Sequence, residues 1–123
     1  MSGAGERRRF LRAPLQIFIN EKTGGQLKLA RGLDIGEGGL KYLTPSSEPP
    51  AAGDVVIEFS LPGTEKAIRA RARVTSTSES RHTCQTSVVF TAIRGSDARV
   101  IRDYVISRKR AELFEAIRNQ HLS

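Results

Sequence analysis

The sequence predicts a mainly β protein: about six short antiparallel strands, arranged as a barrel or a sandwich, followed by one C-terminal α-helix. Three observations lead to this class. Short segments of alternating apolar residues are separated by turn residues, no helical spacing interrupts them, and the spacing changes to a helical period after Ile93. The 123 residues suffice for a single core without disulfides, but not for a catalytic domain beside a regulatory one.

The first two expected strands flank a hairpin turn at residues 23–25 (TGG). Before the turn, the apolar residues of 15–19 alternate with side chains that point the other way, and a second strand follows through residues 27–29. This second strand runs into residues 34–39 (DIGEGG), which we interpret as a turn because the segment is too rich in glycine for a strand interior. Further strands are expected at residues 40–43, 55–61, 67–75 and 83–90.

The segment at residues 67–75 (AIRARARVT) has the clearest alternation. Its apolar side chains are Ile68, Ala70, Ala72 and Val74, and between them lie Arg69, Arg71 and Arg73. Because alternate residues of a strand point to opposite faces, we expect these three arginines on one solvated face.

Residues 96–121 are expected to form the C-terminal helix, since Ser96 and Asp97 can cap its N-terminus. At about 100° per residue the helix has two apolar stripes on nearly opposite sides. The first stripe contains Val100, Ile101, Tyr104 and Val105, and the second contains Ile106, Leu113, Phe114 and Ile117. One straight helix on one barrel cannot bury both, so two arrangements remain open. Either the helix breaks near Ser107 and folds back, or its second half forms a homodimer through Leu113, Phe114 and Ile117.

The chain is strongly basic, with Lys+Arg 20 against Asp+Glu 13 and a net charge of +7. Fifteen of the cations are arginine, whose planar fork suits phosphates and guanine edges, so a phosphate-bearing or nucleotide partner is expected. The sequence has no apolar run long enough for a membrane span, and no apolar stretch follows the basic N-terminal segment, so neither a membrane span nor a secretory signal is expected. A single cysteine, Cys84, cannot form an internal disulfide, which favours a reducing, cytoplasmic setting.

Residues 1–12 form an arginine-dense arm that we expect to be mobile. Arg8 and Arg12 are four residues apart, and Arg7 and Arg9 flank Arg8. Two guanidinium groups at this spacing can close on one ligand, each binding a phosphate or the O6/N7 edge of a guanine through two parallel hydrogen bonds. The alternative interpretation is a solvated basic tail.

The second candidate site is the glycine-rich segment 34–39. The glycines Gly36, Gly38 and Gly39 allow backbone N–H groups to approach an anion, and the Asp34 carboxylate can accept hydrogen bonds from N1–H and N2–H₂ of a guanine. The alternative is a bulged hairpin in which Asp34 only caps a turn.

Together and in this order, the two motifs resemble the PilZ domain, the bacterial receptor module for the second messenger cyclic diguanylate (c-di-GMP). The matching stretches are ERRRFLRAPL at 6–15, LDIGEGGLKY at 33–42 and SVVFTAI at 87–93. The resemblance implies a six-stranded β-barrel over residues 13–93. It also implies that Arg8 and Arg12 hold the ligand on one side, and that Asp34 with the backbone of Gly36, Gly38 and Gly39 holds it on the other. Arg7, directly before Arg8, supplies one guanidinium more than one guanine and its phosphate require, so we expect the arm to hold two stacked ligand molecules, with Arg7 or Arg9 binding the second.

One position departs from the family motif D-x-S-x-x-G, because Gly36 stands where the motif has its serine. The missing hydroxyl removes a hydrogen bond that contributes about 1.5–3 kcal/mol when its partner is charged. The leading hypothesis is a c-di-GMP receptor that relays the signal to a protein partner. The alternative is an adaptor of the same fold that binds no ligand.

Other functions have weaker support in the sequence. A single-stranded nucleic-acid binder fits the sequence pI of about 10.3, but aromatic residues make up only 6% of the chain and cannot form a stacking platform. His82, His121 and Cys84 have no acidic partner at ligand spacing, so no metal, cofactor or catalytic set is expected. The chain is therefore not expected to be an enzyme.

Overall fold

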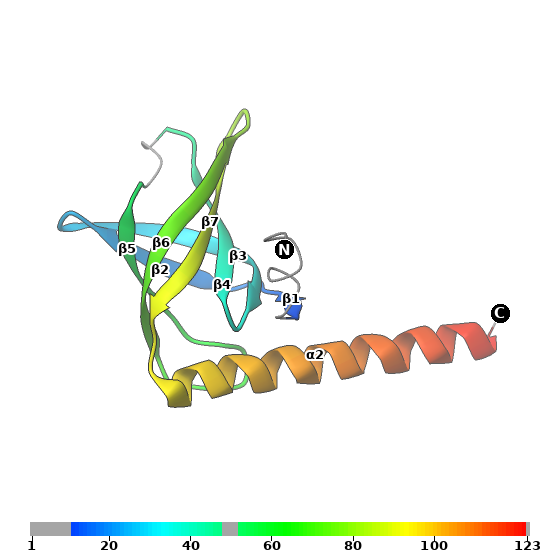
Figure 1. The fold of residues 1–123 in the computed structure, drawn as a ribbon. Coiled ribbons are helices and arrows are strands. Elements are labelled where there is room, and N and C mark those ends of the chain that lie inside the picture. Colours follow the sequence, from blue (N-terminus) through cyan, green and yellow to red (C-terminus); the bar gives the residue numbers. More distant parts are fainter. Residues whose placement is uncertain (1–10, 48–51, 123) are drawn as a thin grey trace, which may run out of the picture.

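The computed structural model describes residues 11–47 and 52–122 of the chain. Within these residues the chain forms seven strands and one helix (Figure 1). The strands are β1 (Arg12–Pro14), β2 (Phe18–Thr23), β3 (Gln26–Gly36), β4 (Gly39–Pro45), β5 (Asp54–Phe59), β6 (Ile68–Glu79) and β7 (Thr83–Ala92), and the helix is α2 (Gly95–Leu122).

Six of these strands close into a barrel. Neighbouring strands are hydrogen-bonded in the order β3-β2-β5-β6-β7-β4, and β4 pairs with β3 to close the ring. All of these pairings are antiparallel. β1 lies outside the ring and pairs with β3. The predicted six-stranded antiparallel barrel is confirmed, and a two-sheet sandwich is excluded.

The N-terminal part of the barrel differs in detail from the prediction of one continuous strand. β1 ends at Pro14 and β2 begins only at Phe18. Between them the chain still follows β3, since the Leu15 amide donates to the Leu33 carbonyl at 2.9 Å. Arg12, which the sequence placed in a mobile arm, is therefore the first residue of a strand.

The glycine-rich segment 34–39 contains the expected turn only at residues 37–38, and the prediction was wrong for its other residues, which lie in strands. β3 continues through Gly36, β4 starts at Gly39, and only two residues turn between them. A Cβ at Gly39 would collide with the Val88 carbonyl oxygen of β7. Glycine at this position therefore allows β4 and β7 to approach closely, and this explains why a glycine lies inside a strand.

The hairpin expected at residues 23–25 is present between β2 and β3. Gly24 and Gly25 have φ values of 56° and 81°, and they connect the pair formed by Thr23 and Gln26. A two-residue turn of this hand needs left-handed backbone at both central positions, which favours glycine.

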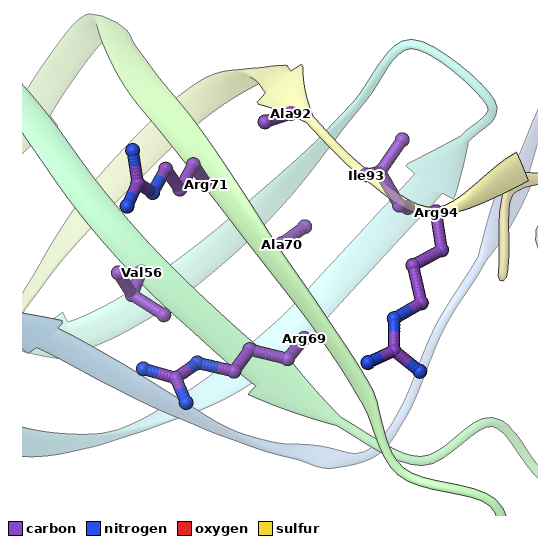
Figure 2. Close-up of a pocket in the computed structure, with 7 residues that line it drawn as sticks. All are labelled: Val56, Arg69, Ala70, Arg71, Ala92, Ile93 and Arg94. Carbon is purple, nitrogen blue, oxygen red and sulfur yellow. The ribbon is translucent and has the colours of Figure 1, made fainter.

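β6 shows the alternation that the sequence predicts. Its inward residues Ile68, Ala70 and Ala72 are buried, and its outward residues Arg69, Arg71 and Arg73 are exposed. Figure 2 shows Arg69 and Arg71 extending from the outer face of the strand. The predicted row of three arginines on one solvated face is confirmed.

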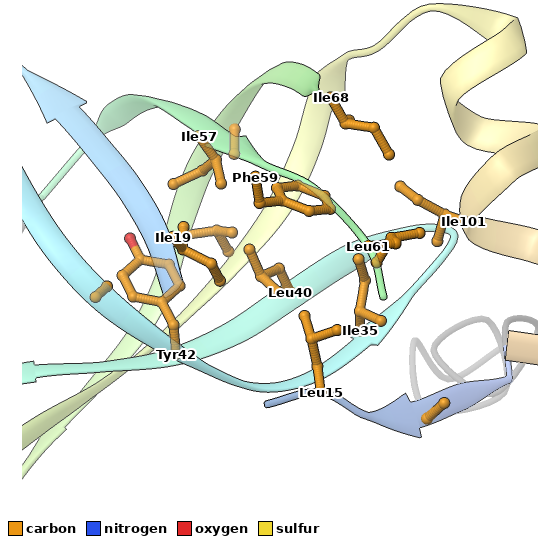
Figure 3. Close-up of a cluster of buried hydrophobic side chains, with 14 of the residues drawn as sticks. Leu15, Ile19, Ile35, Leu40, Tyr42, Ile57, Phe59, Leu61, Ile68 and Ile101 are labelled. Carbon is orange, nitrogen blue, oxygen red and sulfur yellow. The ribbon is translucent and has the colours of Figure 1, made fainter. Parts of the chain in front are cut away.

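The barrel interior holds one hydrophobic core to which the helix also contributes (Figure 3). Its largest fully buried apolar side chains are Leu15, Ile19, Ile35, Leu40, Ile57, Leu61, Ile68 and Ile101. One polar pair lies among them: the Tyr42 hydroxyl donates to Oε2 of Glu21, and both residues are at most 1% exposed. Burial of the phenol, together with its hydrogen bond to the Glu21 carboxylate, raises the pKa of Tyr42.

The first half of α2 packs on one end of the barrel, as expected. Ile101 and Val105 are buried, and Val100 and Tyr104 pack against the core with part of their surface exposed. In Figure 3 the Ile101 side chain points toward Leu61 and Ile68, so the helix closes this end of the core.

The second half of α2 continues in a straight line past the barrel (Figure 1). The helix does not break near Ser107, so the fold-back arrangement considered for its second half is excluded. The apolar residues there remain uncovered, with Leu113 61%, Phe114 69% and Ile117 43% exposed.

Candidate functional site

The candidate site lies where β1 runs beside β3. The strands are antiparallel, and the pairs are Arg12 with Gly36, Ala13 with Ile35 and Pro14 with Asp34. This register brings together the end of the arginine-rich segment and the carboxylate of the glycine-rich segment, which are 22 residues apart in the sequence.

Arg12 and Asp34 form a direct ion pair across the two strands. Nε of Arg12 donates to Oδ1 of Asp34 at 2.6 Å, and Nη2 contacts the same oxygen. The side chains remain 43% and 29% exposed, so both charged groups are accessible from solvent. An exposed pair of this kind contributes about 0–1 kcal/mol to folding, and a ligand with matching groups can therefore replace it easily.

Gly36 is buried between two neighbouring strands. It pairs with Arg12 of β1 and with Gly39 of β4. A Cβ at position 36 would lie 2.7 Å from the carbonyl oxygen of Leu11 and 3.2 Å from Cγ of Arg12. The glycine thus allows the chain just before β1 to close onto β3, a role that the sequence pattern did not reveal.

The other predicted site residues lie partly at the β3–β4 turn. The Gly38 carbonyl accepts a hydrogen bond from the Phe90 amide at 2.9 Å, and Gly39 pairs with Gly36. Both glycines therefore lie next to β7, at the end of the β3–β4 hairpin that carries Asp34. Arg7, Arg8 and Arg9 lie outside the described residues.

Two contacts connect this site to α2. The Tyr104 hydroxyl donates to the Pro14 carbonyl oxygen at 3.1 Å, and Nε of Arg102 lies 4.0 Å from Oε1 of Glu37 in the β3–β4 turn. Sequence reasoning missed both contacts. The tyrosine in an otherwise apolar stripe was an available signal, because its hydroxyl needs a polar partner, whereas nothing in the sequence marks Arg102.

Within residues 11–47 and 52–122, no cluster of three or more His, Cys, Asp or Glu is arranged to hold a metal ion. In the same part of the chain, no helix combines the length and apolar character needed to cross a membrane. Cys84 is fully buried in β7. Among the described residues, the site presents the Arg12 guanidinium and the Asp34 carboxylate to solvent, with Glu37 and Arg102 beside them.

A closed six-stranded barrel with a helix at one end and an accessible Arg–Asp pair beside it defines a barrel-type binding module. The family model described as "PilZ domain" matches residues 6–107, and the chain belongs to this family of receptor and adaptor modules. Comparison with curated protein sequences gave no significant match.

Solved structures of low sequence identity share the fold. The Bacillus subtilis inhibitor of motility MotI (DgrA) has a TM-score of 0.75 at 17% identity, over 84% of this chain and 51% of its own. The PilZ domain of Escherichia coli YcgR, solved with c-di-GMP, has a TM-score of 0.70 at 20% identity, over 89% and 97%. The K. pneumonia MrkH complex with c-di-GMP has a TM-score of 0.65 at 21% identity, over 92% and 55%. The chain thus spans about half of MotI and MrkH and nearly all of the isolated YcgR domain.

Proposed function

We propose that this protein is a cytoplasmic receptor for c-di-GMP that relays the signal to a protein partner and has no enzymatic activity of its own. The observation that carries the proposal is the contact between Arg12 and Asp34, since two residues of the family's binding motifs meet on a solvent-accessible face. YcgR and MrkH are solved with c-di-GMP, and their fold supports the same ligand class here.

The chemistry of the pair suits a guanine nucleotide with phosphates. A phosphate or the O6/N7 edge of a guanine would take the place of Asp34 on the Arg12 fork through two parallel hydrogen bonds. The released Asp34 carboxylate would accept hydrogen bonds from N1–H and N2–H₂ of a guanine. The ligand therefore replaces one weak ion pair by two charge-assisted contacts, with Arg8 and the backbone at Gly36, Gly38 and Gly39 as the further binding groups.

The relay would pass from β1 to α2. Ligand binding at Arg12 would act on β1, and the Pro14 carbonyl of β1 accepts the hydrogen bond from Tyr104 of the helix. The turn next to Asp34 makes a second contact with the helix, through Glu37 and Arg102. Any shift of β1 or of this turn is therefore transmitted to the first half of the helix. A downstream protein that contacts the helix would detect the bound state.

A calorimetric titration with c-di-GMP, beside GTP and a single-stranded oligonucleotide, tests the proposal. We expect saturable binding of c-di-GMP and much weaker binding of the other two. A flat c-di-GMP titration of folded protein would contradict the proposal and favour an adaptor of the same fold that binds no ligand. Preferential binding of the oligonucleotide would instead favour a nucleic-acid-binding barrel.

Gly36→Ser and Gly36→Ala separate the effect of the added Cβ from that of the motif's hydroxyl. Both add the Cβ that meets the Leu11 carbonyl, so both should lower the melting temperature by a few degrees. Only serine supplies a hydrogen-bond donor. We therefore expect the affinity of the Gly36→Ser variant for c-di-GMP to be at least about ten-fold higher than that of the Gly36→Ala variant. Equal affinities of the two variants in calorimetry would show that the hydroxyl has no role in this chain.

We also infer that the projecting half of α2 forms a homodimer. In an antiparallel pair of helices centred near residue 115, Leu113 would lie against Ile117 of the second copy, with Phe114 beside them. The helix extends well past the barrel, so the two barrels would stay apart at opposite ends of the pair (Figure 1). Burying these side chains would contribute about 1.5–3 kcal/mol each, and a two-fold pair is the commonest symmetric assembly.

Light scattering of the full chain tests the dimer. Leu113→Asp and Phe114→Asp should each shift the mass from dimer to monomer, because a charge would enter the apolar contact. Glu115→Arg, a charge change on the opposite side of the helix, should leave the dimer intact. A monomeric wild type would exclude the dimer, and a dimer that survives both Asp variants would exclude this interface.

A further inference from the structure

Two adjoining hollows form a groove on the outer face of the barrel over β5, β6 and β7. The first has a volume of about 470 Å³ and lies beside Arg69, Arg71 and Arg94 (Figure 2). The second, of about 430 Å³, continues past Arg71 toward the β2–β3 hairpin, and the two share Val56 and Arg71. In the order of the ring, β6 lies opposite β3, so this groove is distinct from the Arg12–Asp34 site.

Three guanidinium groups in the first hollow are available for a ligand. Arg69, Arg71 and Arg94 are exposed, and none has an ion-pair partner among residues 11–47 and 52–122. The carboxylate opposite Arg69 in the register is Glu58, which is bound to Lys22 Nζ at 2.5 Å. The hollow is therefore a concentrated positive site on a chain of net charge +7.

The spacing of these groups favours an extended ligand. Arg69 and Arg71 lie two residues apart on the same face of β6, a separation of about 6.6–6.8 Å. An extended peptide repeats its own side chains at the same interval, so acidic residues at alternate positions would place one carboxylate on each guanidinium fork. Arg94 lines the same hollow just before the start of α2, and Ala92 and Ile93 supply apolar contact.

The residues that line the groove argue against nucleic acid as its ligand. None of the residues that line either hollow is aromatic, whereas single-stranded nucleic acids are bound largely by bases stacking on aromatic side chains. The strands beneath the groove are paired on both edges, so a peptide would lie across their outer side chains and would not add a strand.

We propose that this groove binds an extended acidic segment of a partner protein, with carboxylates at alternate positions on Arg69 and Arg71. The inference rests on the proposed function only in that the chain has a protein partner, and it needs no bound nucleotide. Because the two sites lie on opposite sides of the barrel, nucleotide and partner can be held at the same time.

Fluorescence anisotropy with labelled peptides tests the groove without c-di-GMP. The probe is a peptide of about ten residues in which Asp alternates with Val, and the comparison is a peptide of identical composition with its Asp residues in one block. At about 150 mM salt we expect the affinity for the alternating peptide to be at least about ten-fold higher than the affinity for the block peptide. Equal binding of the two peptides, or no binding of either, would overturn the proposal.

A charge-matched pair of variants locates the binding. Arg69→Gln/Arg71→Gln should weaken binding of the alternating peptide about ten-fold or more, whereas Arg81→Gln/Arg99→Gln removes two exposed charges elsewhere and should change it less than about two-fold. Equal loss in both would show unspecific charge attraction and refute the site. Tighter, Arg69-dependent binding of an oligonucleotide would assign the groove to nucleic acid.

The same variants keep this proposal separate from the nucleotide site. Arg12→Ala should leave peptide binding unchanged, and Arg69→Gln/Arg71→Gln should leave c-di-GMP binding unchanged. Failure of the wild type to bind c-di-GMP while the peptide binds would contradict the receptor function alone. Failure of peptide binding in a protein that binds c-di-GMP would contradict the acidic-segment site alone.

Discussion

Arg12→Ala and Asp34→Ala are each expected to weaken c-di-GMP binding about ten-fold or more while leaving thermal stability nearly unchanged. Each substitution removes one side of an ion pair that is accessible to solvent. The pair contributes little to folding, but each partner alone would make a charge-assisted contact to the ligand. The same loss is expected for Arg8→Ala, since that arginine completes the R-x-x-x-R motif.

The barrel offers a matched control for this experiment. Arg73 and Asp54 form a second exposed Arg–Asp pair, at 3.1 Å, on the far side of the ring. Arg73→Ala and Asp54→Ala change the charge by the same amounts, and they should leave c-di-GMP affinity within about two-fold of the wild type. Unchanged affinity in both Arg12→Ala and Asp34→Ala, measured by calorimetry, would overturn the site assignment.

Tyr42→Phe is expected to lower the free energy of unfolding by about 3 kcal/mol at neutral pH. The Tyr42 hydroxyl donates to Glu21 inside the barrel, and Oε1 of Glu21 has no hydrogen-bond partner in the described part of the chain. Without the hydroxyl, a carboxyl group that is 1% exposed would lose its donor. Urea unfolding followed by circular dichroism measures the loss.

Tyr104→Phe is the control for this prediction. It removes a hydroxyl that bonds to a backbone carbonyl at 3.1 Å on the outside of the barrel, and it should cost less than about 1.5 kcal/mol. A Tyr42→Phe variant as stable as Tyr104→Phe would show that the Glu21 carboxyl does not depend on Tyr42.

The stability difference between wild type and Tyr42→Phe should also depend on pH. Burial, reinforced by the bond to Glu21, raises the pKa of Tyr42 in the folded state above its ordinary value of about 10. The folded protein then keeps a proton that the unfolded chain loses. The advantage of the wild type is therefore constant below pH 10 and falls by up to about 1.4 kcal/mol per pH unit above it. A difference that stays constant from pH 8 to 11 would contradict the shifted pKa.

The strands were predictable from the sequence wherever alternation was strict. The Arg69, Arg71 and Arg73 row appears on the outer face of β6 because the two-residue period leaves no other arrangement. The same period carried a signal about Glu21, which continues the inward series of Leu15 and Ile19 and is buried with them.

Other features depended on close approaches between segments distant in the sequence. Gly36 and Gly39 looked like turn residues, but they lie in strands because the Leu11 and Val88 carbonyl groups pack against them. No local pattern reports such an approach. The straight course of α2 was undetermined for a different reason: good helix formers follow Ser107, so the helix continues without a core to support its apolar side chains.

The candidate site came from the order of two motifs and not from any local signal. Arg12 and Asp34 are 22 residues apart, and only the antiparallel register of β1 on β3 makes them neighbours. Sequence reasoning could supply the residue types and the expected ligand. The contacts of Tyr104 and Arg102 with the site depend on how the helix seats on the barrel, which no spacing in the chain encodes.

Because α2 projects past the barrel, a rotation at its attached end would move its free end much further. From Val105, the last buried residue among those of α2 whose side chains are described, the helix extends 17 residues to Leu122, about 25 Å at 1.5 Å per residue. The attached end lies at the end of the barrel, where the Tyr104 hydroxyl donates a hydrogen bond to the Pro14 carbonyl of β1. A rotation of α2 by about 10° at that end would displace its last turn by about 4 Å. A displacement of this size would break a side-chain contact between the helix end and a partner protein. On the proposed relay, a small rearrangement at β1 would thus produce a larger displacement at the C-terminal end of α2.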